Sequence, residues 1–123
     1  MSAPQQRLGH RAELACAAWL GGRGWQVLEH RWRSASGEID LVCLDPGGTL
    51  VAVEVKLRRT GRAGSAAEAV DARRVIRLRR TLLDYAAQRR VASRSLRIDL
   101  VAIEPSGGAA AWRLSRWAGI DQW

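Results

Sequence analysis

The stretch GEIDLVCLDPGGTLVAVEVKL, residues 37–57, decides the fold of this chain. Residues 38–44 and 50–57 are mostly apolar and rich in valine and leucine, and a turn sequence with one proline and two glycines joins them. This pattern predicts two antiparallel strands connected as a hairpin. We expect Leu44 to pair with Leu50 across the turn, which sets the register of every other pair in the hairpin.

The predicted register gathers charged side chains. Side chains alternate faces along a strand, so Glu38 and Asp40 share one face of the first strand. Asp40 then lies opposite Glu54, and Glu38 lies opposite Lys56, with directly opposed Cβ atoms about 4.5–5.5 Å apart. Carboxylates at that distance repel, and buried charges are paired or bind metals. The residues are therefore equally consistent with an acidic pair that binds Mg²⁺ and with an ordinary ion pair between Lys56 and Glu54 or Glu38.

Lys56 is the only lysine among 20 basic residues, and the others are arginines. Arginine is a broad planar fork, whereas lysine is a compact ammonium with three rotatable donors. An acidic pair that binds Mg²⁺ polarises a phosphodiester and lowers the pKa of a bound water. A neighbouring ammonium orients that water or stabilises charge on the phosphoryl oxygens. The position of Lys56 thus favours phosphodiester chemistry.

Length and composition bound the remaining choices. The 123 residues predict a flexible N-terminal tail over 1–8 and one domain over 9–123. The formal net charge of +8 indicates a polyanionic partner, with nucleic acid favoured. Cys16 and Cys43 lie in apolar segments without CxxC spacing, which predicts buried, reduced thiols in a cytoplasmic protein. No apolar run is long enough for a signal peptide or a membrane span, so we expect no membrane partner.

The remaining elements follow from hydrophobic periodicity and from Gly and Pro positions. We expect helices over 8–23 and 66–90, and strands over 25–33, 38–44, 50–57, 96–104 and 110–114. A helix between two strands points to a right-handed crossover and a parallel strand pair. The order α-β-β-β-α-β-β therefore predicts an α/β fold with a mixed sheet flanked by helices.

The segments Gly37-Glu38-Ile39-Asp40 and Val53-Glu54-Val55-Lys56 resemble the D…ExK signature of the restriction-endonuclease-like, or PD-(D/E)XK, superfamily. Over about residues 9–103 the chain is most similar to YraN-type bacterial proteins, relatives of archaeal Holliday-junction resolvases. The resemblance implies a restriction-endonuclease-like core. It implies a Mg²⁺-dependent endonuclease, with Mn²⁺ able to substitute, that hydrolyses DNA phosphodiester bonds at branched or junction structures.

The same resemblance assigns roles residue by residue. Asp40 and Glu54 would bind the metal, with the Val55 backbone carbonyl as a further ligand, and Lys56 would be the catalytic lysine. Glu13, on the first predicted helix, would be an acid near the metal. Glu38 belongs to the motif and would either lie behind the metal ligands or pair with Lys56.

Two groups of arginines are candidates for nucleic-acid contacts. Arg58, Arg59 and Arg62 lie in a loop directly after Lys56, where they could clamp phosphate. Arg73, Arg77 and Arg80 form a stripe on the second predicted helix, with Arg74 beside it. For this stripe a solvated helix surface is the favoured interpretation, and a phosphate-contacting face is the alternative. Trp32 is the tryptophan best placed to stack on a base, although filling the core is the expected role of the tryptophans.

The chain departs from the family pattern at three positions. Ala12 stands where glycine is expected, Arg31 where asparagine is common, and Arg74 where lysine is usual. None of these removes a catalytic group.

Resolvase-like relatives often pair across a two-fold axis, so a homodimer is expected by analogy. Two alternatives stay open: a nucleic-acid-binding module that retains the nuclease fold without catalysis, and a structural domain whose acids form ordinary ion pairs.

Overall fold

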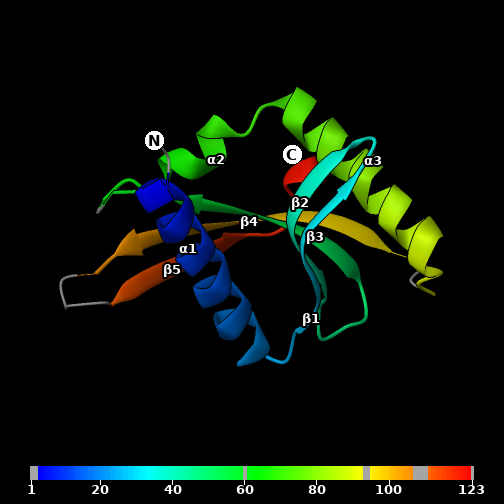
Figure 1. The fold of residues 1–123 in the computed structure, drawn as a ribbon, viewed down its shortest axis with the longest axis horizontal. Helices are drawn as coiled ribbons and strands as arrows, with labels where there is room; N and C mark the ends of the chain where they lie inside the picture. The colour runs from blue at the N-terminus through cyan, green and yellow to red at the C-terminus, as the bar shows by residue number, and fades with distance from the viewer. Residues whose placement is uncertain (1–2, 60, 93–94, 107–110, 123) are drawn as a thin grey trace.

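A computed structural model of the chain describes residues 3–59, 61–92, 95–106 and 111–122, and its centre is one five-stranded sheet (Figure 1). The elements are α1 (Ala3–Gly21), β1 (Gln26–Ser34), β2 (Gly37–Leu44), β3 (Leu50–Leu57), α2 (Ser65–Ala69), α3 (Ala72–Arg89), β4 (Leu96–Pro105), β5 (Trp112–Trp117) and the 3₁₀ turn η1 (Ile120–Gln122). The predicted α/β class and element order are confirmed. Helix α1 begins five residues before its expected start at Leu8.

The sheet has the strand order β1-β2-β3-β4-β5. Strands β3 and β4 are parallel, and the other neighbours are antiparallel. The parallel pair arises because α2 and α3 connect β3 to β4, as a crossover requires. The mixed sheet is therefore also confirmed. Within the described residues, no helix is both long and apolar enough to cross a membrane.

Helix α1 covers one face of the sheet. Its buried side chains Ala12, Cys16 and Leu20 recur every four residues and pack against β2, β3 and β4. The small Ala12 and Cys16 side chains allow a close approach of the helix to the strands. Both Cys16 and Cys43 are free and buried, as predicted.

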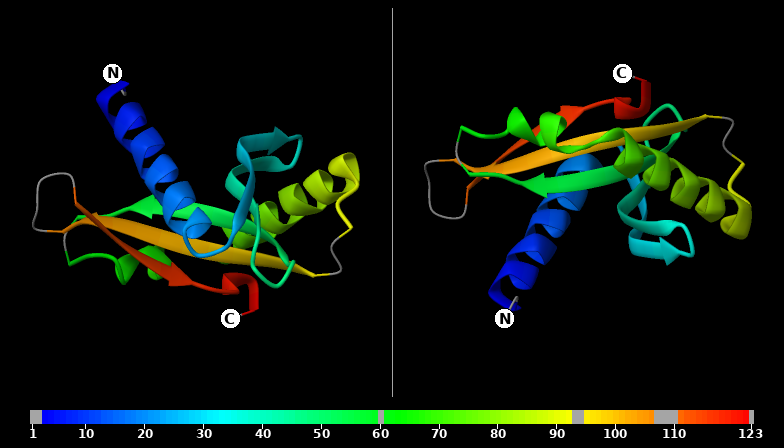
Figure 2. Two further views of the ribbon diagram at one scale, coloured as in Figure 1. Left: turned by 90° about the horizontal axis from the view of Figure 1, so that it is seen from below. Right: turned by 90° about the horizontal axis from the view of Figure 1, so that it is seen from above.

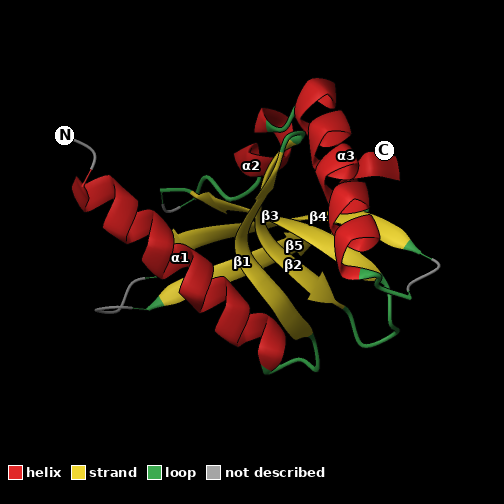
Figure 3. Cartoon of the chain, turned by 45° about the vertical axis from the view of Figure 1, so that its right-hand side comes forward, coloured by secondary structure: helices red, strands yellow, loops and turns green. Residues whose placement is uncertain are grey.

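Helix α3 covers the opposite face (Figures 2 and 3). Leu78, Leu82 and Tyr85 are buried there, and the Tyr85 ring lies 5.1 Å from the Trp32 ring in a T-shaped contact. Trp32 is only 8% exposed, so its suggested role in base stacking is wrong and its core role is confirmed. The single helix expected over 66–90 is interrupted, because Asp71 is extended and caps α3 by accepting a hydrogen bond from the Arg74 N–H at 2.9 Å.

Strand β2 leaves β3 partway along its length. Pairing between them runs from Leu44 with Leu50 to Leu41 with Val53, which confirms the predicted hairpin register. Strands β1 and β2 stay paired beyond this point, up to their shared turn. Ile39 packs on the α3 side of the sheet and Leu41 on the α1 side, so β2 twists sharply at the residue between them. In Figure 1 the β1–β2 hairpin (cyan) rises away from the other strands.

Candidate metal and catalytic site

Asp40 lies where β2 leaves β3. Beyond the last registered pair of the two strands, its Oδ2 accepts a hydrogen bond from the Val55 N–H at 2.8 Å. The N–H and C=O of one residue in an extended strand point to the same side. The Val55 carbonyl therefore also points toward the side that β2 vacates. The departure of β2 thus brings an acidic side chain and a main-chain carbonyl to the same edge of β3.

The carboxyl groups of Asp40 and Glu54 lie close enough to influence each other's ionisation. Burial, followed by the charge of Glu54, raises the pKa of Asp40 to about 7. Burial also opposes ionisation of Glu54, but the hydrogen bonds and charge of Arg74 outweigh it and lower the Glu54 pKa. Near neutral pH the Asp40 carboxyl is therefore close to its midpoint of protonation, and the negative charge of the pair resides mainly on Glu54.

Arg74 is the main partner of Glu54. Its Nε and Nη2 donate to the two Glu54 carboxylate oxygens at 2.8 and 2.9 Å, a bidentate geometry. The Lys56 Nζ lies 3.8 Å from Glu54 Oε2. The Glu54 side chain is 3% exposed, whereas those of Arg74 and Lys56 are 29% and 34% exposed. A buried carboxylate thus has two partly exposed cations beside it.

The fourth acid predicted from sequence, Glu13, approaches from α1. Its Oε1 accepts a hydrogen bond from the Arg31 Nε at 2.7 Å, and its charge contributes to the raised pKa of Asp40. Arg31 has a left-handed backbone with φ of 49°. Asparagine tolerates that conformation better than most residues, which gives a physical reason for asparagine at this position in the resembled family.

Glu38 does not lie opposite Lys56, contrary to the sequence prediction. Because β2 has left β3 before this point, Glu38 pairs with Arg33 on β1, both in register and through an ion pair. Its backbone carbonyl accepts a 3.5 Å hydrogen bond from the Arg74 Nη2. Glu38 therefore contributes to the cluster mainly through its main chain.

The donor set fits a hard divalent cation. No three His, Cys, Asp or Glu side chains gather into a metal-binding group within the described ranges, so Glu13 is not a third direct ligand in this geometry. Asp40 and Glu54 with the Val55 carbonyl offer oxygen ligands only, and Mg²⁺ is commonly held by one or two carboxylates with waters and substrate phosphate. Arg74 and a cation would compete for the same Glu54 oxygens.

Two residues of this cluster were not predicted from the sequence as its members. Arg31 and Arg74 are the counter-ions of Glu13 and Glu54, whereas helical periodicity puts Arg74 beside a surface stripe. A signal was present, because both positions depart from the resembled family's pattern. The other predicted residues Asp40, Glu54, Lys56 and the Val55 main chain do come together.

The predicted nucleic-acid-binding arginines lie on two sides of the acidic cluster. Arg58, Arg59 and Arg62 follow the end of β3 and border a shallow pocket with Ser65. Arg73, Arg77 and Arg80 on α3 line a groove of about 550 Å³ with Ser36 of the β1–β2 turn. Among the described residues, none of these six arginines has an ion pair. Their charge is available to a polyanion.

Comparison with known proteins identifies close relatives. The model described as "Uncharacterised protein family UPF0102" matches residues 12–103. A UPF0102 protein of Nocardioides sp. is 46% identical over 102 residues, covering 83% of this chain and 82% of the relative. A UPF0102 protein of Moorella thermoacetica is 39% identical over 123 residues, covering 98% and 95%. A third, from Beutenbergia cavernae, is 39% identical over 113 residues, covering 92% and 94%.

Proposed function

The chain belongs to the UPF0102 family, and from the geometry of its acidic site we propose that it is a metal-dependent endonuclease that hydrolyses DNA phosphodiester bonds. Branched or junction DNA is the proposed substrate. The observation that carries the proposal is the pair formed by the buried Glu54 and the partly exposed Asp40, with Lys56 beside it. The resemblance of these residues to the D…ExK signature of restriction-endonuclease-like enzymes adds support.

Each residue has a distinct role in this proposal. Asp40, Glu54 and the Val55 carbonyl would hold Mg²⁺ or Mn²⁺, and the bound cation would supply the charge that polarises the phosphodiester. Asp40 must first release its proton, because a carboxylic acid is a poor ligand. Arg74 must give up at least one Glu54 oxygen. The Lys56 ammonium, near the buried carboxylate and partly exposed, would orient the attacking water and stabilise charge on the phosphoryl oxygens.

Positive charge on both sides of the cluster supports a nucleic-acid substrate. The arginines after β3 and those on α3 could contact phosphates flanking the cleaved bond. We propose DNA as the nucleic acid and a homodimer as the form that matches a two-fold symmetric junction. The free, buried cysteines support a reducing compartment such as the cytoplasm as the location.

One observation favours a second candidate function. Arg74 already neutralises Glu54 in a bidentate pair, as a structural ion pair would. If this pair is permanent, the chain is a non-catalytic nucleic-acid-binding module that retains the nuclease fold. That module would bind DNA with salt-sensitive affinity even without Lys56.

Metal binding separates these two functions before any substrate is chosen. Calorimetric titration of Mn²⁺ into the wild-type protein should give a binding isotherm that Asp40→Asn weakens strongly. Repeating the titration in buffers of different ionisation enthalpy should reveal release of a proton at pH 6.5, since Asp40 must ionise to bind metal. Absence of Mn²⁺ binding by the folded wild-type protein would favour the non-catalytic module.

Cleavage is then tested directly. Labelled junction, flap, single-stranded and duplex DNA are incubated with Mg²⁺ and the wild-type protein, Lys56→Ala or Asp40→Asn. We expect cleavage by the wild type only, with both variants folded and still able to bind DNA. Failure of the folded, metal-bound wild type to cut any of the four substrates would refute the proposal.

A further inference from the structure

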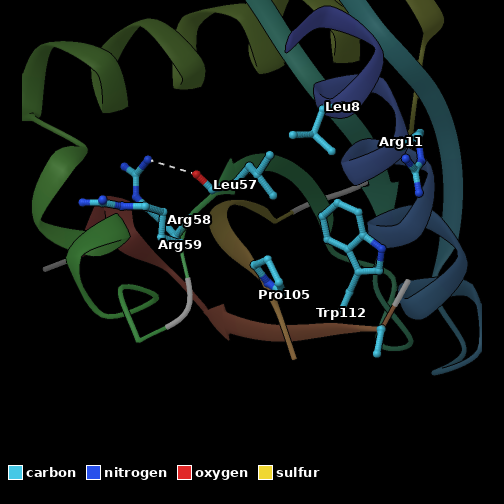
Figure 4. Close-up of a pocket in the computed structure, with 8 residues that line it drawn as sticks. Leu8, Arg11, Leu57, Arg58, Arg59, Pro105 and Trp112 are labelled. Atoms are coloured by element: carbon cyan, nitrogen blue, oxygen red, sulfur yellow. Dashed lines mark hydrogen bonds between the residues drawn. The ribbon is translucent and has the colours of Figure 1, made fainter. Parts of the chain in front are cut away.

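An apolar groove of about 470 Å³ lies at the end of β3, on the side of the sheet that α1 covers. Figure 4 shows Leu8 of α1, Leu57 of β3, Pro105 of β4 and Trp112 of β5 around a common space. Leu8 is 39% exposed and Trp112 is half-buried. An apolar concavity of this kind, bordered by charge, is typical of a ligand site.

Arginines stand at both ends of the groove. Arg11 lies at one end, and Arg58 and Arg59 lie at the other (Figure 4). None of the three has an ion pair with any described residue. The Arg58 Nη1 donates a 3.3 Å hydrogen bond to the Leu57 carbonyl, and its buried Nε has no partner in the described structure. The groove therefore complements a flat apolar group with negative charge on either side.

We infer that this groove binds an unpaired nucleotide of a single-stranded DNA segment, an inference that rests on the proposed function. The base would stack on Trp112 between Leu8 and Leu57, and the flanking phosphates would contact Arg11 at one end and Arg59 at the other. A base within a duplex is stacked on both faces, so it could enter only by leaving the helix. The groove thus selects DNA with unpaired nucleotides.

The position of the groove relates this nucleotide to the acidic pair. Leu57 directly follows Lys56 and lies two residues after Val55, roughly 7 Å along the strand. The Leu57 side chain lies on the α1 face of β3, whereas those of Glu54 and Lys56 lie on the α3 face. A neighbouring phosphodiester would therefore reach the cluster around Asp40 across the edge of β3 that β2 vacates. The substrate class is therefore DNA with a single-stranded segment next to the cleaved bond, such as a flap or a junction with an unpaired arm.

Binding measured without metal tests the groove independently of catalysis. Fluorescence anisotropy in EDTA compares labelled oligothymidine with a blunt duplex. Loss of stacking in Trp112→Ala should weaken binding of the single strand by about 5- to 150-fold and leave duplex binding unchanged. Trp112→Phe, which keeps an aromatic ring, should retain most of the affinity.

Two further variants and a control test the groove if Trp112→Ala does not fold. Leu8→Ala should weaken single-strand binding less than loss of the indole does. The matched control is Leu83→Ala. Leu83 lies on α3 outside the groove and is 49% exposed, so this variant should bind like wild type. Arg59→Ala should lower the slope of log affinity against log salt by about 0.7 on the single strand.

Equal losses on single strand and duplex, or no loss on either, would overturn the inference. A change in the sedimentation of Trp112→Ala would also overturn it, because a second copy of the chain would then occupy the groove. Asp40→Asn separates the two proposals, since it should abolish cleavage and keep single-strand selectivity. If the wild-type protein binds single strands through Trp112 but never cleaves DNA, the proposed nuclease function is refuted and the inferred role of the groove in binding is supported.

Discussion

Asp40 illustrates at the scale of one residue how a reactive position costs stability. Its carboxyl accepts a hydrogen bond from the Val55 N–H and lies beside Glu54 in a partly buried position. The pKa rises from 3.8 to about 7 on folding, so the folded protein binds the proton more tightly than the unfolded chain does. This contribution to stability is complete below pH 4 and is lost as pH rises through about 7.

Asp40→Asn should remove that loss. The amide oxygen can still accept from Val55, and the side chain carries no charge to repel Glu54. We expect the variant to match wild type near pH 4.5 and to exceed it at pH 8 by on the order of 2 kcal/mol. Thermal unfolding in metal-free buffers across this range measures the difference. Glu68→Gln, an exposed carboxylate on α2, is the control, and parallel pH profiles for wild type and Asp40→Asn would contradict the expectation.

Arg74 and a divalent cation are alternative partners of Glu54. Arg74→Ala should destabilise the metal-free protein by up to about 3 kcal/mol, because it leaves the buried Glu54 carboxylate without its bidentate partner. Mn²⁺ should then raise the Tm of Arg74→Ala more than that of wild type, since the competing guanidinium is gone. Arg79→Ala removes the exposed partner of Asp121 and should show the wild-type response. An equal or smaller Mn²⁺ effect in Arg74→Ala would rule out competition.

At the scale of elements, the β1–β2 turn is held against α3 at Gly37. Its φ is 152°, and a Cβ built there would lie 3.1 Å from both the Arg77 Cγ and the Thr81 Oγ1. Backbone conformation and close contacts both disfavour a side chain at this position. The turn therefore keeps the hairpin close to the helix that carries Arg74.

Gly37→Ala should destabilise the protein by roughly 1–3 kcal/mol through strain and the displaced helix side chains. Gly9→Ala is the matched control, because Gly9 lies within α1 and a Cβ there meets nothing within 4 Å. Alanine at that position should stabilise by about 0.5–1 kcal/mol. Urea denaturation of both variants measures the two effects, and a neutral Gly37→Ala would show that the turn can move away from α3.

The interruption between α2 and α3 helps to determine where Arg74 lies. Sequence periodicity predicts one helix over 66–90, and the hydrophobic spacing of α3 is indeed regular. The capping hydrogen bond from the Arg74 N–H to Asp71 places Arg74 in the first turn of the helix. A continuous helix would have carried this residue in its interior, without the cap that begins the helix at this point.

At the scale of the whole molecule, the net charge of +8 is unevenly compensated. Arg79, Arg89 and Arg113 each pair with a carboxylate. Arg73, Arg77 and Arg80 line a groove, and none has an ion pair with a described residue. Part of the charge that a polyanion could use therefore lies in this groove on α3.

Replacing Arg73, Arg77 and Arg80 together by glutamine should weaken duplex binding and lower the salt slope by as much as about 2.7, or about 0.9 for each phosphate that is no longer neutralised. The same replacement of Arg79, Arg89 and Arg113 changes net charge equally and is the control. We expect a much smaller change in slope there. Equal slopes for the two triple variants would mean that net charge, and not this groove, governs DNA binding.

The fold class and the hairpin were predictable because their signals are local. Alternation of side chains with period two and the Pro-Gly-Gly turn determine the strands and the pairing of Leu44 with Leu50. The same alternation puts Glu54 and Lys56 on one face of β3, where the ammonium does lie near the carboxylate. These features depend on neighbours a few residues apart, so the sequence alone determined them.

Only the tertiary structure decided which charges meet. Strand β2 leaves β3 at Asp40. As a result, Asp40 accepts a hydrogen bond from the Val55 N–H, and Glu38 forms an ion pair with Arg33. Packing of α3, twenty residues along the chain from Glu54, brings Arg74 onto its carboxylate. Such choices depend on the curvature of the sheet and on where helices settle against it, and they follow from the packing of the whole core and not from any local pattern.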